Sequence, residues 1–302
     1  MTMYADRYVA FVDILGFREL VKEIERGKLP PEYVRDVLAV VHEDETYSRE
    51  AWKYADFRAI SVSDAVALSC APDPGGLDLL FYSICRLTAA LLLRGYFIRG
   101  AVVRGKLWHD NTTVFGPALV QAYDIETKVA RYPRIVVTRD VFLDVQQSIK
   151  DISVGVGKHL DGMLKQADDG PMYLHVLRHL IRELVKLQDR AARFPEFQQE
   201  PLYQETLLMR NHIQQAFDRS IDDPGIFEKV QWFARYWNQV VHSNLRSIQP
   251  LTGPVFPTLF SERKRMTDTA NACRQICWWA PQVLLRSPVR RHTLLAKAGA
   301  SR

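Results

Sequence analysis

The spacing of apolar residues changes several times along the first part of the chain, and these changes predict a mixed α+β domain. Residues 8–13 form a short apolar run rich in β-formers, which is typical of a buried strand. Residues 17–25 carry apolar side chains at helical spacing, and Gly27 ends this predicted helix. Two further strands are expected at 57–62 and 65–70, joined by a tight turn.

Strands and helices continue to alternate further along the chain. An almost wholly apolar helix over 77–94 is expected to be buried, and a strand over 96–103 follows it. Pro117 opens a helix that leads to another strand at 134–138. This order indicates an α+β sheet with helices packed on one face.

The chain changes character near residue 177. Beyond this point the sequence is helical to about residue 243, and a last helix is expected over 267–285. We therefore place a domain boundary here, with an α+β domain at 1–176 and a helical C-terminal region with a basic tail at 177–302.

The composition is that of a folded globular protein, with 47% hydrophobic and 25% charged residues in a chain of 302. No run approaches about 20 uncharged apolar residues, so no membrane span is expected. The N-terminal segment contains Asp6 and Arg7 and lacks the apolar core of a signal peptide. The four cysteines form no Cys-x-x-Cys pair, which argues against a disulfide framework or a zinc site. We expect a cytoplasmic protein.

The net charge of +5 is unevenly distributed. Residues 251–302 hold nine Lys or Arg and two acidic residues, whereas the preceding 250 residues are close to neutral. A basic tail is compatible with nucleic-acid contact, but a solvated chain end is the commoner explanation. We therefore expect no nucleic-acid partner, and the function is expected to lie in the body of the chain.

Asp13 and Asp64 are the first candidates for chemistry. Asp13 ends the first predicted strand and Asp64 lies in the predicted hairpin turn, so both would project from one end of the sheet if these strands are neighbours. Paired carboxylates favour a cation between them, and oxygen ligands favour Mg²⁺ or Mn²⁺. The glycine turn after Asp13 leads into a helix whose first N–H groups could hold phosphate. Two simpler interpretations stay open, a helix N-cap for Asp13 and an ordinary turn residue for Asp64.

Four sequence motifs resemble those of the class III nucleotide cyclases and occur in the order of that family. The segment Phe-Val-Asp-Ile-Leu-Gly-Phe at 11–17 resembles their F-x-D-I-x-G-F signature. Val-Ser-Asp-Ala at 62–65 is similar to the second metal motif, I-G-D-A, with Ser63 in place of glycine. Residues 99–105 resemble the R-x-G-[IV]-x-x-G strand, and residues 115–119 resemble the start of the G-x-x-V-N-x-A-x-R helix.

This resemblance implies both a fold and a site. The fold would be class III cyclase-like, a ferredoxin-like βαββαβ domain followed by the helical C-terminal extension. Asp13 and Asp64, with the backbone carbonyl of Ile14, would bind two Mn²⁺ or Mg²⁺ ions that hold a triphosphate, and Phe17 would contact the substrate. Because this family builds its sites between two cyclase domains, the resemblance also implies a homodimer.

Three positions depart from the family pattern. Val120 and Asp124 stand where the family's helix carries an asparagine and a transition-state arginine, and Ile60 replaces the lysine that reads a purine. The altered pattern resembles the pyrimidine cyclases of bacterial Pycsar antiphage systems, whose cyclic UMP or cyclic CMP activates a separately encoded effector. It implies conversion of UTP to 3′,5′-cyclic UMP and diphosphate. A cytidylate cyclase, a purine nucleotide cyclase and a catalytically silent nucleotide-sensing module stay open as alternatives.

Four residues could replace the missing groups. Arg99 and Arg104 are the nearest cations for the polyphosphate or the transition state, and regular strand alternation would turn them to opposite faces, so only one is expected to serve. Tyr54 and Arg58 precede the hairpin and could stack on a pyrimidine or hydrogen-bond to its edge. Simpler roles stay open for all four, namely surface ion pairs for Arg99 and Arg104 and exposed strand-entry positions for the other two.

Overall fold

The computed structural model describes residues 4–43, 55–151, 157–191, 200–245 and 247–252. The chain divides into two compact units, Met1–Phe256 and Pro257–Arg302, and the second lies wholly outside the described residues. The helix predicted over 267–285 and the candidate residue Tyr54 therefore lie outside them as well. The fold described below is that of the first unit.

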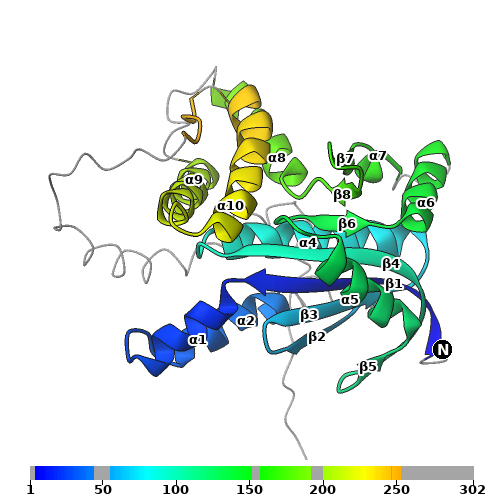
Figure 1. Ribbon diagram of the computed structural model, residues 1–302. Helices are drawn as coiled ribbons and strands as arrows, with labels where there is room; N and C mark the ends of the chain where they lie inside the picture. Colours follow the sequence, from blue (N-terminus) through cyan, green and yellow to red (C-terminus); the bar gives the residue numbers. More distant parts are fainter. Residues whose placement is uncertain (1–3, 44–54, 152–156, 192–199, 246, 253–302) are drawn as a thin grey trace, which may run out of the picture. The chain divides into compact units, whose positions relative to one another are not determined.

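An eight-stranded sheet forms the centre of this unit (Figure 1). Its order is β2-β3-β1-β4-β6-β8-β7, and β5 pairs with β4 off this path. β1 lies between β3 and β4 and runs antiparallel to both, whereas β4 and β6 are parallel. The strands are β1 (Tyr4–Leu15), β2 (Arg58–Val62), β3 (Ala65–Cys70), β4 (Phe97–His109), β5 (Val114–Phe115), β6 (Ile135–Val137), β7 (Leu164–Gln166) and β8 (Met172–Leu174).

The first four strands and the helices between them have the ferredoxin-like βαββαβ order that the sequence predicts. α1 (Phe17–Glu25) and α2 (Glu32–Glu43) follow β1, then comes the β2-β3 hairpin, and α4 (Pro74–Leu92) leads into β4. These strands lie in the order β2-β3-β1-β4 and are antiparallel throughout. The α+β fold class is confirmed, and so is the presence of C-terminal helices. These are α8 (Arg178–Ala191), α9 (Pro201–Arg219), α10 (Pro224–Trp237) and the π-helix η3 (Asn238–His242).

Helices lie on both faces of the sheet, so the expectation that they cover one face is wrong. α5 (Pro117–Lys128) lies across β1 and β4 (Figure 1). α4 and α6 (Arg139–Lys150) pack on the opposite face, where the Tyr8 hydroxyl donates to Asp144 of α6 at 2.9 Å. The physical reason is that residues 8–10 of β1 are all buried, which requires cover on both faces because successive side chains alternate.

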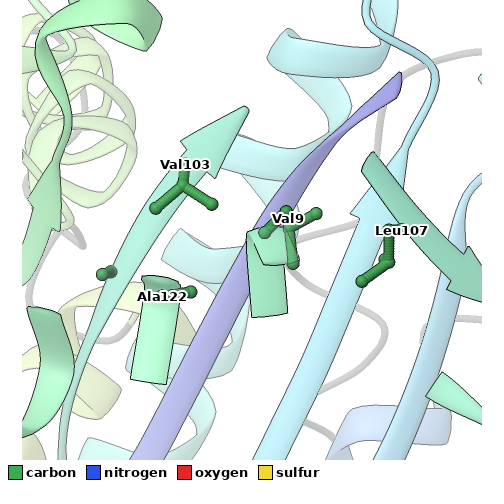
Figure 2. Packing of buried hydrophobic residues seen from close by; sticks show 6 residues of the cluster. Val9, Val103, Leu107 and Ala122 are labelled. Atoms are coloured by element: carbon green, nitrogen blue, oxygen red, sulfur yellow. The ribbon is translucent and has the colours of Figure 1, made fainter. Parts of the chain in front are cut away.

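The core between α5 and the sheet is built from alanine, valine and leucine side chains. The two alanines on the inner face of α5 leave room for this helix to approach the strands closely. They lie one helical turn apart, so residue 126, one turn further on, lies on the same face of α5. This cluster consists of Val9 of β1, Ala101, Val103 and Leu107 of β4, and Ala118 and Ala122 of α5 (Figure 2).

The apolar helix predicted over 77–94 is the core helix α4. By length and composition it could cross a membrane, but 61% of its 18-residue apolar window is buried inside the structure. It contacts the sheet and also α6, α8 and α9. The predicted boundary at 176/177 falls between β8 and α8, and the compact unit continues through it to Phe256.

Candidate active site

The carboxyl end of β1 meets the turn of the β2-β3 hairpin. Asp13 lies directly opposite Ala65 in the β1-β3 ladder, and the Ile14 N–H donates to the Asp64 carbonyl at 2.9 Å. Asp64 belongs to the two-residue turn between the paired residues Val62 and Ala65. The structure therefore brings Asp13 and Asp64 to the same end of the sheet, as the sequence predicts.

Two left-handed backbone positions shape this end of the sheet. Gly16 has φ 90° and begins α1 without a side-chain cap, so the alternative interpretation of Asp13 as the N-cap is wrong. Ser63 has φ 58°, a conformation in which glycine is favoured because it has no Cβ. The serine found here in place of the family's glycine is therefore a strained substitution that keeps the turn.

Arg99 lies directly opposite Asp13 in the β1-β4 ladder. Its Nε donates to Asp13 Oδ2 at 3.2 Å and lies 2.6 Å from Glu126 Oε1 of α5. The three side chains are only 23%, 18% and 4% exposed, respectively. Of the two candidate arginines, Arg99 is thus the one that shares a site with the predicted metal ligands.

Glu126 is the residue that the sequence analysis missed. It follows Ala118 and Ala122 at four-residue spacing, so it lies on the face of α5 that packs on the sheet. Its Oε2 accepts a hydrogen bond from Thr127 at 3.0 Å, whereas its Oε1 is buried and has no hydrogen bond of acceptable geometry in the described structure. The close approach of Oε1 to Arg99 is therefore an ion contact. An acidic residue on an otherwise apolar helix face is the sequence signal that could have identified it.

Burial governs the charge of both buried acids in this site. It raises the pKa of Asp13, the hydrogen bond and charge of Arg99 oppose this effect, and Asp64 adds to it. Burial also raises the pKa of Glu126, which Arg99 lowers and which Asp13 and Asp64 raise. The three carboxylates therefore repel one another, and an additional cation would stabilise their ionised forms.

A divalent ion fits this donor set. Asp13 and Asp64 offer carboxylate oxygens at one edge, where the positive charge of Arg99 already lies against Asp13. Among the described residues, no group of three or more His, Cys, Asp or Glu is placed to hold one metal ion. The arrangement suits Mg²⁺ or Mn²⁺ held by one or two carboxylates and completed by substrate phosphates, and it does not suit an all-protein metal cage.

Two other predicted site residues, Arg104 and Phe17, do not offer their side chains to this site. Arg104 faces the other side of the sheet, where it binds Asp6 and Asp144, both at 3.0 Å. The opposite orientation of Arg99 and Arg104 is the one that strand alternation predicts. Phe17 is buried at the first position of α1, so only its backbone is available to a ligand.

Arg58 lies on the same face as Asp13, because its ladder partner Ser69 is also the partner of Val9. Asp13 lies four residues beyond Val9 along β1, about 13 Å at ~3.3 Å per residue, and Arg58 lies two strands to the side of Val9. The guanidinium of Arg58 donates to Asp56 Oδ1 at 2.9 and 2.8 Å and to the His109 carbonyl.

A buried network stands behind Arg58. Arg7 pairs with Asp56 Oδ2 at 2.5 Å and donates to Ser69 Oγ at 2.9 Å, and this hydroxyl contacts His109 Nδ1 at 2.7 Å. Burial and the two arginines lower the pKa of His109 to about 4, so the imidazole is neutral at pH 7. Because Asp56 pairs with both guanidinium groups, it holds Arg7 and Arg58 in fixed positions.

Exposed apolar residues lie on α5 and on β1 and β5 at the opposite end of the sheet from Asp13. We define the aromatic patch as Tyr4, Phe115, Val120 and Tyr123, all of which are exposed; Val120 is 61% exposed. The Phe115 ring stacks on Tyr4 with centroids 6.4 Å apart, and Tyr123 meets the edge of Phe11 at 5.6 Å.

Two of the three departures from the cyclase pattern lie on α5, and the third lies on β2. Val120 belongs to the aromatic patch, and Asp124 is partly exposed and pairs with Lys128 at 2.8 Å. Ile60 of β2 is partly exposed and points to the face of Asp13, because its ladder partner Ala67 is also the partner of Phe11. None of these three side chains can supply the cation or the hydrogen bonds that the family's residues would supply.

No protein-family model matches the chain, and no curated protein matches it. The solved structures that match include the crystal structure of the guanylyl cyclase Cya2, at a TM-score of 0.32 and 11% sequence identity. That match covers 57% of this chain and 91% of the other.

Proposed function

We propose that this chain is a metal-dependent pyrimidine nucleotide cyclase that converts UTP to 3′,5′-cyclic UMP and diphosphate. The observation that carries the proposal is the pair Asp13 and Asp64 at one end of the sheet, with Arg99 as a cation against Asp13. Acids on β1 and on the hairpin, beside the start of a helix, make a site suited to a metal-bound triphosphate.

Asp13 and Asp64 would hold the divalent ions, and the Ile14 carbonyl would be a further ligand. Bound Mg²⁺ or Mn²⁺ would neutralise the triphosphate and acidify the ribose 3′-hydroxyl. The backbone N–H groups of Phe17 and Arg18, in the first turn of α1, would donate to phosphate oxygens. Arg18 also lowers the pKa of Asp13 by its charge, so it adds positive potential at this end of the sheet.

The reaction forms a bond between the 3′-oxygen and the α-phosphorus. The bond from the α-phosphorus to the bridging oxygen breaks, diphosphate leaves with that electron pair, and the hydroxyl proton passes to solvent. Arg99 is the arginine that would stabilise the charge that develops on the phosphate oxygens, because it already lies at the metal-binding carboxylates. Arg104 is occupied on the other face by Asp6 and Asp144.

Arg58 supports the choice of a pyrimidine, and of uracil in particular. Among the described residues, its hydrogen bonds use three of the five N–H donors of a guanidinium, which leaves two for a ligand. A donor-only group suits the O4 acceptor of uracil better than the N4 amino donor of cytosine. Ile60 offers no hydrogen bond to a purine, and Tyr54 would fill the depth that a smaller base leaves. CTP is the second candidate substrate.

The aromatic patch supports a homodimer. Exposed apolar clusters are typical of protein interfaces, and aromatic residues are enriched there. A second copy that covers Val120 and Tyr123 would pack on α5, the helix that also carries Glu126 of the candidate site. We propose two equivalent sites per dimer, in a cytoplasmic enzyme whose product activates a separately encoded effector in antiphage defence.

A catalytically silent nucleotide-sensing module is the second candidate function, and Asp124 favours it because an acid stands where the family has its transition-state arginine. One experiment separates the candidates. The purified protein is incubated with Mn²⁺ and an equimolar mixture of ATP, GTP, CTP and UTP, and the products are identified by mass spectrometry. We expect cyclic UMP as the main product. Cyclic AMP or GMP as the main product would overturn the pyrimidine proposal, and no cyclic product would favour the silent module.

A further inference from the structure

We infer that Glu126 is the positioning residue of Arg99. When a divalent ion takes the place of the Arg99 guanidinium on Asp13, Glu126 keeps that guanidinium in the site. The inference rests on the proposed function for the metal ion. Its structural basis is the shared contact of one arginine with two acids from different elements, the partly buried Asp13 and the buried Glu126.

A single Nε group serves both carboxylates. It lies 3.2 Å from Asp13 Oδ2 and 2.6 Å from Glu126 Oε1, so Glu126 is the closer partner. Asp13 is on β1 and Glu126 is on α5, with Arg99 on β4 between them. The arginine can therefore lose one partner and keep the other without a change in the backbone.

A metal ion at Asp13 would displace Arg99 from that carboxylate, since both cations compete for the same oxygens. Without another anion, the displaced guanidinium would lose its charged partner in a largely buried place, which is costly. Glu126 removes this cost because it is nearly fully buried and already in contact. It therefore makes metal binding at Asp13 easier and keeps a cation beside the triphosphate.

Glu126 could instead be a third metal ligand, and a double-mutant cycle separates the two roles. If Glu126 acts through Arg99, Glu126→Gln leaves Arg99 with Asp13 alone and weakens Mn²⁺ binding only while Arg99 is present. If Glu126 binds the metal directly, the same substitution weakens Mn²⁺ binding whether or not Arg99 is present. Glutamine is isosteric with glutamate, so the packing of α5 is preserved.

The experiment measures Mn²⁺ affinity of the nucleotide-free protein by electron paramagnetic resonance of free Mn²⁺. We expect Glu126→Gln to weaken binding by about tenfold, a loss between those typical of an exposed and of a fully buried ion contact. Arg99→Met should tighten binding, and in that background Glu126→Gln should change it by at most about threefold. Asp144→Asn is the matched control, because it removes a partly buried acid that pairs with an arginine on the opposite face.

The outcomes distinguish this inference from the proposed function. Equal Mn²⁺ affinity of the wild type and Asp13→Asn overturns the proposed metal site and the inference together. Weaker binding in Asp13→Asn with unchanged binding in Glu126→Gln overturns the inference alone. A tenfold loss from Glu126→Gln in both the Arg99 and the Arg99→Met backgrounds also overturns it, in favour of direct ligation.

Discussion

Glu205 provides a test of whether the C-terminal helices pack on the rest of the unit as described. It lies in the apolar stripe of α9, is 7% exposed, and has an Oε2 atom with no hydrogen-bond partner among the described residues. Burial alone raises its pKa from 4.5 to about 7. We predict that Glu205→Gln removes a pH-dependent loss of stability.

The sign and size follow from proton linkage. Because the folded-state pKa of Glu205 is raised, the fold favours the protonated acid, so there is no penalty below pH 4.5, where both states are protonated. Stability then falls as pH rises from 4.5 to 7 and stays low above that. The difference between these two pKa values corresponds to about 3 kcal/mol at ~1.36 kcal/mol per pH unit.

The assay is urea unfolding of the wild type and Glu205→Gln at a series of pH values from 4 to 8. The difference in free energy of unfolding should grow in favour of the variant by about 3 kcal/mol across this range. Asp169→Asn is a control that should show no pH-dependent difference in this range, because the hydrogen bond from Arg134 lowers the pKa of Asp169 from 3.8 and its stabilisation is lost only at pH values below the series. A difference for Glu205→Gln that stays constant with pH would mean that Glu205 is solvated and that α9 does not pack here.

Three further predictions concern assembly, base choice and the hairpin. Val120→Asp places a charge in the aromatic patch, so light scattering should show monomers instead of a homodimer, and these monomers should be inactive. Leu143→Asp, at an exposed apolar position of α6, should leave the dimer intact. A fully active monomer would contradict the proposed dimer. Arg58→Ala and Tyr54→Ala should reduce the preference for UTP over ATP by about tenfold or more in competition, and an unchanged ranking in both would show that the base pocket lies elsewhere. Ser63→Gly should raise the free energy of unfolding by about 1 kcal/mol because φ is positive there, and a loss of stability in thermal unfolding would refute the strain.

Local sequence patterns were sufficient for most of the elements around the site. The predicted helix at 17–25 has the bounds of α1, because apolar spacing and a flanking glycine mark both of its ends. The predicted strand at 65–70 likewise has the bounds of β3. α6 was missed, although Val141, Val145 and Ser148 form a buried stripe, because only two of its three positions are apolar.

The contacts that assemble the site depend on strand register, which no local pattern contains. The sequence placed Asp13 and Asp64 at one end of the sheet through the order of its strands, and the β1-β3 ladder bears this out. It could not pair Asp13 with Arg99, because this needs the alignment of β1 with β4 across 86 residues. Glu126 was missed for a related reason, since its burial follows from how α5 packs on the sheet.

The most direct test of the central claim is cyclic UMP formation from UTP and Mn²⁺ by the wild type, Asp13→Ala and Asp64→Ala. Each substitution removes one of the two carboxylates that would hold the metal ions, so we expect cyclic UMP from the wild type and none above background from either variant. Asp144→Asn should keep wild-type activity, and all four proteins should unfold cooperatively. Wild-type rates in Asp13→Ala or Asp64→Ala would contradict the assignment of this site as a nucleotide cyclase centre.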